Sequence, residues 1–135
     1  MKLNSICSLV AVSVLSGLVF VSQARSSSDL VTDAELALLP EYCAARLGGN
    51  NTQAYRNWNQ RLGQKVFVHM HHYCFGLNFM NRAATEFDSK KRKFILGQAI
   101  RNFEYVLRTW PKDFSLTPTA EMYRQQAEMM LSMTR

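Results

Sequence analysis

The stretch HMHHYCFGL, residues 69–77, places three histidines and a cysteine within a long apolar segment. That segment, residues 66–84, contains no proline and only Gly76 as a glycine, and its apolar side chains surround the axis when it is drawn as a helix. A helix that is apolar on all sides is normally buried rather than half exposed. We therefore expect residues 66–84 to form one central helix that the rest of the chain covers.

The metal-binding side chains of this stretch do not converge on one ion if the segment is helical. Residues three or four positions apart share a helix face, so we expect His69 to lie with His72, and His71 with Cys74, on different sides. The chain has no other histidine and neither an HExxH nor a CxxC motif, so further ligands would have to come from Cys43. The simplest interpretation is that the histidines are partly buried polar residues bonded to their neighbours. The alternative is a small metal or redox site that uses these five side chains.

The first 24 residues have the layout of a secretory signal. Lys2 gives a positive start, residues 6–21 are apolar or small without charge, and Ser22-Gln23-Ala24 supplies small residues at the positions that determine cleavage. We predict a signal peptide at 1–24, a periplasmic or secreted protein, and no stable membrane span after cleavage. A retained anchor is the alternative, although the apolar run is short for a span.

Cleavage would remove Cys7 and leave Cys43 and Cys74 in a compartment that permits disulfides. We predict a disulfide between these two residues, which would join an N-terminal helix to the central one. Two structural free thiols are the next alternative, and a metal site is the third. In the chain-entropy model, closing a loop of this length contributes roughly 3 to 4 kcal/mol to stability.

The remaining sequence predicts short helices that follow a Ser-rich flexible leader at 25–31. Capping residues, prolines and glycines set the expected boundaries, and Thr32 with Glu35 is predicted to form a capping box at the start of the first turn. They predict a short turn at 33–38, helices at 40–47, 52–62, 66–84 and 92–110, a polar loop at 85–93, and a last helix that Thr117 caps. No stretch alternates polar and apolar residues for long enough to indicate a strand. We therefore predict a single all-α domain over residues 32–135.

Seven residues of the hairpin at 72–111 have the spacing of a known motif: Phe75, Gly76, Phe79, Ala99, Phe103, Val106 and Pro111. Their arrangement resembles a tetratricopeptide repeat, in which small residues let two helices approach closely, a Phe fills the gap and a proline begins the next repeat. The interval from Gly76 to Ala99, which is 99 − 76 = 23 positions, exceeds that of the repeat and predicts a longer loop. The resemblance implies helical hairpins stacked as a short, degenerate array.

The resemblance also implies a function in protein interaction rather than catalysis. Residues 39–43 (LPEYC) and 69–83 (HMHHYCFGLNFMNRA) are similar to a group of exported bacterial repeat proteins without known catalysis. The chain shows no phosphate-binding loop, nucleophile elbow or haem-attachment motif. We expect a non-enzymatic module in the periplasm or cell envelope, without a cofactor, that binds another envelope protein.

The last helix lacks the helix that would complete its hairpin, so its apolar side is a candidate binding surface or homo-oligomer contact. The candidate partner-binding residues are Met122, Tyr123, Met130 and Met133. Flexible, polarizable Met side chains suit an adaptable surface. The alternative is an ordinary core stripe that completes the domain.

The chain has a formal net charge of +6. A surplus of this size mainly keeps a small domain soluble, and the secretory signal argues against nucleic acid as a partner. The run Lys90-Lys91-Arg92-Lys93 opposes the helix dipole if it lies at a helix start, so we expect solvated loop and first turn. Contact with anionic lipid or an envelope polymer is the other interpretation of this run.

Overall fold

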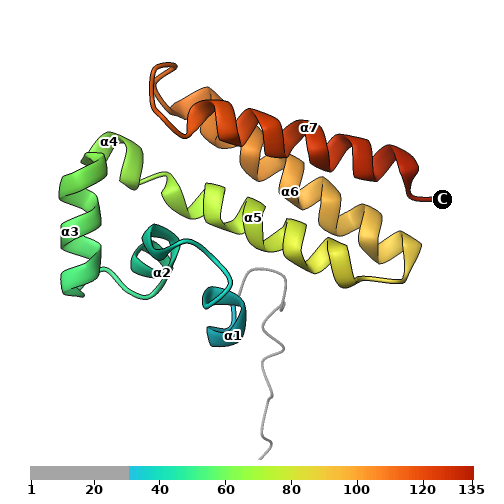
Figure 1. Cartoon of the computed structure of the whole chain (residues 1–135), viewed down its shortest axis with the longest axis horizontal. Helices are drawn as coiled ribbons and strands as arrows, with labels where there is room; N and C mark the ends of the chain where they lie inside the picture. Colours follow the sequence, from blue (N-terminus) through green and yellow to red (C-terminus); the bar gives the residue numbers. More distant parts are fainter. Residues whose placement is uncertain (1–30) are drawn as a thin grey trace, which may run out of the picture.

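The structure is a computed structural model that describes residues 31–135. The predicted signal peptide at 1–24 and nearly all of the leader at 25–31 lie outside the described residues. The described part is all-helical and contains no strand, which confirms the predicted fold class (Figure 1). Its helices are α1 (Asp33–Leu36), α2 (Glu41–Leu47), α3 (Gln53–Leu62), α4 (Gln64–Phe67), α5 (Met70–Thr85), α6 (Ser89–Thr109) and α7 (Thr117–Met133).

The three longest helices lie side by side, with α6 between α5 and α7 (Figure 1). The short helices gather around the other side of α5, where α2 packs against it. Helix α5 therefore has neighbours on two sides, and nine of its sixteen residues are buried. The core is built around its buried side chains and those of α6, with α7 covering α6.

The predicted single helix at 66–84 is wrong, because the segment is broken at Val68 and His69. Helix α4 ends at Phe67 and α5 begins at Met70, and the two differ in direction (Figure 1). The apolar pattern is the same on both sides of the break, so it gives no local signal. A break frees backbone carbonyls that a continuous helix would satisfy, and buried carbonyls need hydrogen-bond donors.

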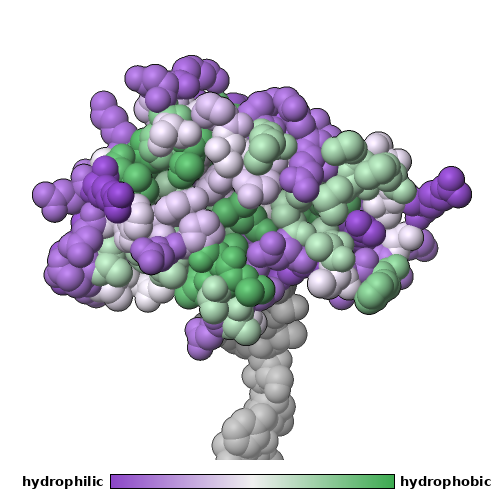
Figure 2. Space-filling view, viewed as in Figure 1, coloured by the Kyte–Doolittle hydropathy of each residue, from purple (hydrophilic) through white to green (hydrophobic). Residues whose placement is uncertain are grey.

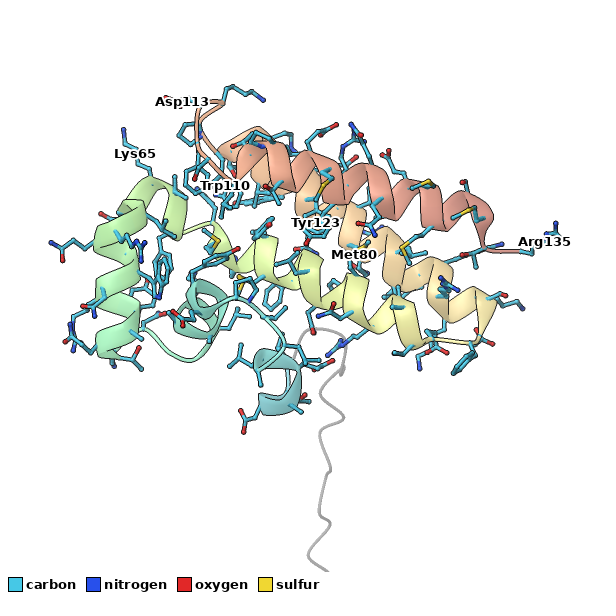
Figure 3. The ribbon with its side chains drawn as sticks, viewed as in Figure 1. Lys65, Met80, Trp110, Asp113, Tyr123 and Arg135 are labelled. Carbon is cyan, nitrogen blue, oxygen red and sulfur yellow. A yellow bond between two sulfur atoms is a disulfide. The ribbon has the colours of Figure 1, made fainter. Side chains whose placement is uncertain are left out.

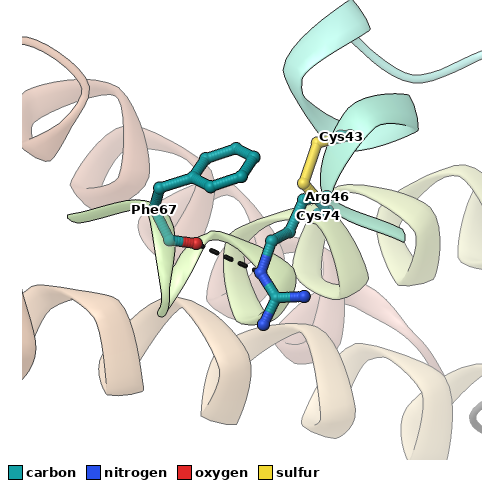
Figure 4. Close-up of a disulfide and its surroundings, with 4 residues drawn as sticks. All are labelled: Cys43, Arg46, Phe67 and Cys74. Carbon is teal, nitrogen blue, oxygen red and sulfur yellow. Dashed lines mark hydrogen bonds between the residues drawn. A yellow bond between two sulfur atoms is a disulfide. The ribbon is translucent and has the colours of Figure 1, made fainter. Parts of the chain in front are cut away.

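Arg46 supplies donors to the freed carbonyls of Phe67 and Val68. Trp110 adds a hydrogen bond to the neighbouring carbonyl of Val66, which also accepts from the backbone N–H of His69. Arg46 of α2 donates from Nε to the carbonyl oxygen of Phe67 at 3.1 Å (Figure 4). It also donates from Nη2 to the carbonyl oxygen of Val68 at 3.2 Å. Trp110, at the end of α6, donates from its indole Nε1 to the carbonyl oxygen of Val66 at 3.2 Å. The bend is therefore fixed from both sides, by α2 and by α6.

The predicted loop at 85–93 is also wrong in extent. Only Glu86, Phe87 and Asp88 separate α5 from α6, and Asp88 caps α6 by accepting a hydrogen bond from the backbone N–H of Lys91 at 2.7 Å. The long interval between Gly76 and Ala99 is therefore filled mainly by additional helical turns of α5 and α6. Most of residues 85–93 are exposed and polar. Their sequence therefore resembles that of a loop although most of them are helical.

Two predicted helix starts move by one position. Pro40 precedes α2 as its capping residue, and Thr117 is the first residue of α7, whereas we predicted it as the cap. The hydroxyl of Thr117 is used differently: it donates to the carbonyl oxygen of Pro111 at 3.0 Å and closes the α6–α7 connection. The capping box of Thr32 and Glu35 is confirmed.

Helix α3 is attached by aromatic contacts. Tyr55 meets Phe67 edge to face with ring centroids 5.0 Å apart, and Trp58 meets Tyr42 at 5.7 Å. Tyr55 and Trp58 are three positions apart and share one face of α3, so this helix packs on α2 and α4 through that side.

Gly76 of α5 packs directly against the Phe103 ring of α6. A Cβ atom at this position would stand 2.7 Å from Cε1 of Phe103, well inside van der Waals contact. Ala99, Phe103 and Val106 of α6 are fully buried. The structure therefore places a glycine against a Phe ring where the motif resemblance expects small and large residues to meet.

The other motif residues differ in burial, from Phe79 in the core to the exposed Pro111. Phe79 is 7% exposed near the far end of α5, Phe75 is half-buried and meets His71 edge to face, and Pro111 is exposed at the start of the α6–α7 connection. These three residues border the close crossing but do not form it.

The predicted disulfide is present and joins α2 to α5. Cys43 and Cys74 are both fully buried and close a loop with a sequence separation of 31 (Figure 4). Arg46 lies one helical turn beyond Cys43, so the covalent link and the guanidinium hydrogen bonds hold the same two segments together.

We predict that the double substitution Cys43→Ala and Cys74→Ala lowers the free energy of unfolding by about 3 to 4 kcal/mol, because the unfolded chain regains the entropy of the opened loop. Urea denaturation of the oxidised parent and the variant measures the difference. Intact mass after alkylation without reductant confirms that the parent has no free thiol at either position. A difference below about 1 kcal/mol would contradict a stabilising cross-link.

The two helical glycines provide a matched pair of substitutions. We predict that Gly76→Ala lowers the free energy of unfolding by about 1 to 3 kcal/mol, because the new methyl group displaces the Phe103 ring. Gly97→Ala should instead raise it by about 0.5 to 1 kcal/mol, since only the flexible end of Arg101 lies nearby, at 3.5 Å, and alanine favours helix. Denaturation curves of both variants give the signs, and stabilisation of both would show that the close crossing is absent.

Candidate functional site

Two of the three histidines face α6. The Nδ1 atom of His69 lies 3.1 Å from the hydroxyl of Tyr105, and the ring of His72 lies over that of Tyr105 with centroids 3.7 Å apart. The Nδ1–H of His72 donates to Oδ1 of Asn102 at 2.9 Å. The predicted pairing of His69 with His72 on one face is therefore confirmed.

The third histidine faces α2. The Nδ1 atom of His71 lies 2.9 Å from the carbonyl oxygen of Val68 and 3.2 Å from Nη2 of Arg46. A carbonyl oxygen only accepts and a guanidinium only donates, so the shorter contact places the proton on Nδ1. Nδ1–H and the guanidinium then both donate to the Val68 oxygen, and Nε2 is left as the acceptor of the ring.

The predicted separation of the two histidine pairs is wrong in part. The rings of His71 and His72 have centroids only 4.2 Å apart. Adjacent residues are about 100° apart around a helix, but their side chains both lean toward the N-terminal end. At the first turn of α5 this brings the two rings together, whereas Cys74 one turn later faces Cys43.

The five side chains of the proposed metal site do not share one point. The two sulfurs are bonded to each other, and each imidazole has a partner within the protein. Among residues 31–135, no set of three His, Cys, Asp or Glu side chains is placed to hold a metal ion. Thiolate ligation by Cys43 or Cys74 would first require reduction of the disulfide.

The electrostatic environment of His71 favours its neutral form. Burial, the adjacent His72 and the guanidinium of Arg46 together lower the pKa of His71 from 6.5 to about 4. A protonated His71 would bring a second positive charge beside Arg46 at the chain bend. His71 therefore resists protonation in mild acid, because its lowered pKa keeps the ring neutral.

We predict that this histidine makes the fold less stable as the pH falls from about 6.5 to about 4. In that interval the unfolded chain takes up a proton that the folded His71 resists, so acid favours unfolding. His71→Asn retains an N–H donor for the Val68 carbonyl but does not titrate, so proton uptake on unfolding should drop by up to one proton. Urea denaturation at a series of pH values measures the slope, and His69 and His72 are common to both proteins. Parallel profiles for parent and variant would contradict the assignment.

Helix α7 has apolar residues on two opposite sides. Its inner side is packed: Ala120 and Ala127 are fully buried, and Tyr123 stacks on Phe103 with centroids 5.7 Å apart. Figure 3 shows Tyr123 pointing inward from α7. Met130 also packs partly against the core. Tyr123 and Met130 are therefore partly buried against the core and do not form the open surface that we predicted, as the alternative of a core stripe expected for them.

The outer side of α7 exposes three methionines. Met122, Met129 and Met133 are 54%, 57% and 66% exposed, and their spacing of seven and four positions places them on one face. Met122 and Met133 were predicted as partner-binding residues, whereas Met129 was missed. We call these residues, with the exposed Gln125, Gln126 and Ser132, the outer α7 face. Pale green, hydrophobic surface follows α7 toward its C-terminal end in Figure 2.

Charges border the outer α7 face and are already paired along the helix. Arg124 forms ion pairs with Glu121, at 2.6 Å, and with Glu128. The side-chain hydrogen bond from Arg124 lowers the pKa of Glu121 to about 2, so this pair stays ionised over a wide pH range. The exposed methionines therefore lie between neutral amide side chains and a cluster in which one cation, Arg124, pairs with two carboxylates, Glu121 and Glu128.

Two pockets are present on the described part of the chain. The first, of about 400 Å³, lies at the far end of the α5–α6 hairpin and is lined by Phe79, Arg82, Thr85, Glu86, Lys91, Phe94 and Ile95. The second, of about 390 Å³, is a shallow hollow between α2 and α3 lined by Glu41, Ala44, Ala45, Gly48, Thr52, Ala54 and Trp58. The first pocket has an apolar floor beside charged groups, whereas small side chains shape the second.

Some important residues were not found from the sequence. Arg46 and Trp110, which fix the bend, carry no local signal because their partners are backbone atoms far along the chain. Tyr105 and Asn102 are three residues apart on α6, so their common face could be predicted, but not that it meets the histidines. Met129 was identifiable from its spacing to Met122 and Met133.

Comparisons with protein-family models, with curated proteins and with solved structures found no match to this chain. Within residues 31–135, no helix combines the length and the apolar character needed to cross a membrane.

Proposed function

We propose that this chain is a non-enzymatic, exported helical module, of tetratricopeptide-repeat-like design, that binds another protein through the outer α7 face. The observation that carries the proposal is the line of three methionines, each more than half exposed, on a helix whose opposite side is fully packed. Contiguous exposed apolar residues bordered by polar ones are typical of interaction surfaces.

The position of α7 supports a helix as the bound element. In the described chain α7 packs on α6 and has no further helix on its outer side (Figure 1). Residues 122, 129 and 133 repeat at the spacing with which one helix packs along another. If the resemblance to a repeat holds, this is the place where the next helix of the array would lie.

The surface shape favours a protein partner over a small ligand. A helix face is convex, whereas small-molecule sites are concave. Met side chains are flexible and polarizable, and they adapt to different apolar partners. The paired charges of Arg124, Glu121 and Glu128 would form a polar rim that needs little rearrangement on binding.

The disulfide and the predicted secretory signal support an oxidising compartment such as the periplasm or the cell envelope. The buried cross-link stabilises the N-terminal half of the domain and leaves α7 untouched. An interaction at α7 would therefore act on a rigid scaffold.

We predict that a photo-crosslinking amino acid at Met129 gives a discrete protein adduct in cells of the source organism, because this position is the centre of the outer α7 face. The same amino acid at Gln60, an exposed position on α3, is the matched control. Adducts are resolved by gel electrophoresis and identified by mass spectrometry, and an adduct of twice the chain mass would assign the face to self-association. Absence of any adduct at Met129, or identical adducts from both positions, would refute the proposal.

A further inference from the structure

We propose that the outer face of α6, together with Phe87, binds the surface of an anionic phospholipid bilayer. This face is separate from the outer α7 face and is defined by Lys90, Lys93, Phe94, Arg101 and Arg108. On a helix of 3.6 residues per turn these positions lie on one side. They point away from the buried residues Leu96, Ala99 and Phe103, which pack on α5 and α7.

The cations of this face are not used within the described part of the fold. Lys90, Lys93, Arg101 and Arg108 are all exposed, and the ion pairs among residues 31–135 involve other cations. Glu104, which is partly buried, is the one carboxylate on the same side. The face therefore presents a row of positive charge along most of a helix of 21 residues.

The placement of this charge is unfavourable for the helix itself. Lys90 and Lys93 stand in the first turns of α6, where the helix dipole repels cations. Asp88 offsets part of the cost by capping the first turn. A basic helix start that the fold does not use is consistent with an anionic partner outside the molecule.

Exposed aromatic rings at the same end point to a bilayer rather than a soluble polyanion. Phe87, in the α5–α6 turn, is 97% exposed, and Phe94 is 55% exposed. A soluble polyanion would be matched by the cations alone, whereas a bilayer also accepts apolar rings at the level of its headgroups. Figure 2 shows hydrophobic, green surface projecting at this end of the hairpin.

The acidic residues beside Phe87 do not oppose this orientation. Glu86 forms an ion pair with Lys91 at 2.7 Å, and Asp88 accepts the backbone hydrogen bond of the helix cap. Both negative charges are thus offset at the turn. The pocket of about 400 Å³ that adjoins Phe94 adds an apolar floor, formed by Phe79 and Ile95, next to the same end.

The test places a fluorescent reporter at the turn of the full chain. Phe87→Trp should move its emission to shorter wavelength with vesicles of phosphatidylcholine and phosphatidylglycerol, and should not move with phosphatidylcholine alone. Lys65→Trp is the control, because Lys65 lies at the opposite end of the molecule (Figure 3). The parent, which contains only the native Trp58 and Trp110, gives the background emission, and a shift that exceeds this background reports lipid contact at the inserted tryptophan.

Charge substitutions in the Phe87→Trp background test whether the cations of α6 contribute to vesicle binding. Each cation near an anionic membrane contributes roughly five-fold to binding, so Lys90→Gln with Lys93→Gln should weaken vesicle binding roughly 25-fold. Lys65→Gln with Lys112→Gln removes the same charge from the far end and should change binding by less than about three-fold.

Each other outcome overturns the proposal. The absence of an emission shift, or an equal shift with neutral vesicles, excludes an anionic bilayer surface at the turn. Equal weakening by the two charge pairs shows a response to net charge alone. Binding of soluble polyphosphate through Lys90 and Lys93, with no emission shift of the Phe87→Trp protein on vesicles, assigns the face to a soluble polyanion instead.

Discussion

The freed backbone carbonyls of Phe67 and Val68 are the constraint on which the rest of the structure depends. A chain that bends inside an apolar segment exposes carbonyl groups that must find donors, because an unpaired carbonyl away from water is costly. Arg46 supplies these donors from α2, and the indole N–H of Trp110 adds a hydrogen bond to the adjacent Val66 carbonyl from the side of α6. In doing so they bring α2 and the end of α6 to the same bend. The disulfide between Cys43 and Cys74 then closes the contact with α2 covalently.

The bend also explains the environment of the histidines. It places His69, His71 and His72 at the first turn of α5, where Tyr105 and Asn102 receive two of the rings and Arg46 adjoins the third. A cluster that suggests metal chemistry in the linear sequence is thus divided between two packing contacts. The low pKa of His71 follows from this placement, since burial and a neighbouring guanidinium both disfavour the charged ring.

Beyond the bend, α6 and α7 each use one side for packing and leave the other side free for contacts of different chemistry. The inner side of α6 carries Ala99 and Phe103, whereas its outer side is basic with exposed Phe94. The inner side of α7 carries Ala120 and Ala127, whereas its outer side exposes neutral methionines. The two proposed surfaces would therefore recognise different partners, an anionic bilayer and an apolar helix, without competing for the same residues.

Local sequence patterns were enough to establish the all-α class, the capping box at Thr32 and Glu35, the pairing of Cys43 with Cys74, and the face shared by His69 and His72. These features follow from rules that act over about one helical turn, or from there being two cysteines in the described domain. The three-residue turn before α6 is also set locally, by the cap of Asp88 on Lys91, within a stretch whose polar composition suggested a longer loop. Long-range packing set the break after Phe67 and the side of α7 that faces the core. Both depend on groups 20 or more positions away, such as the donors of Arg46 and the Phe103 ring that stacks on Tyr123, and helical periodicity carries no information at that distance.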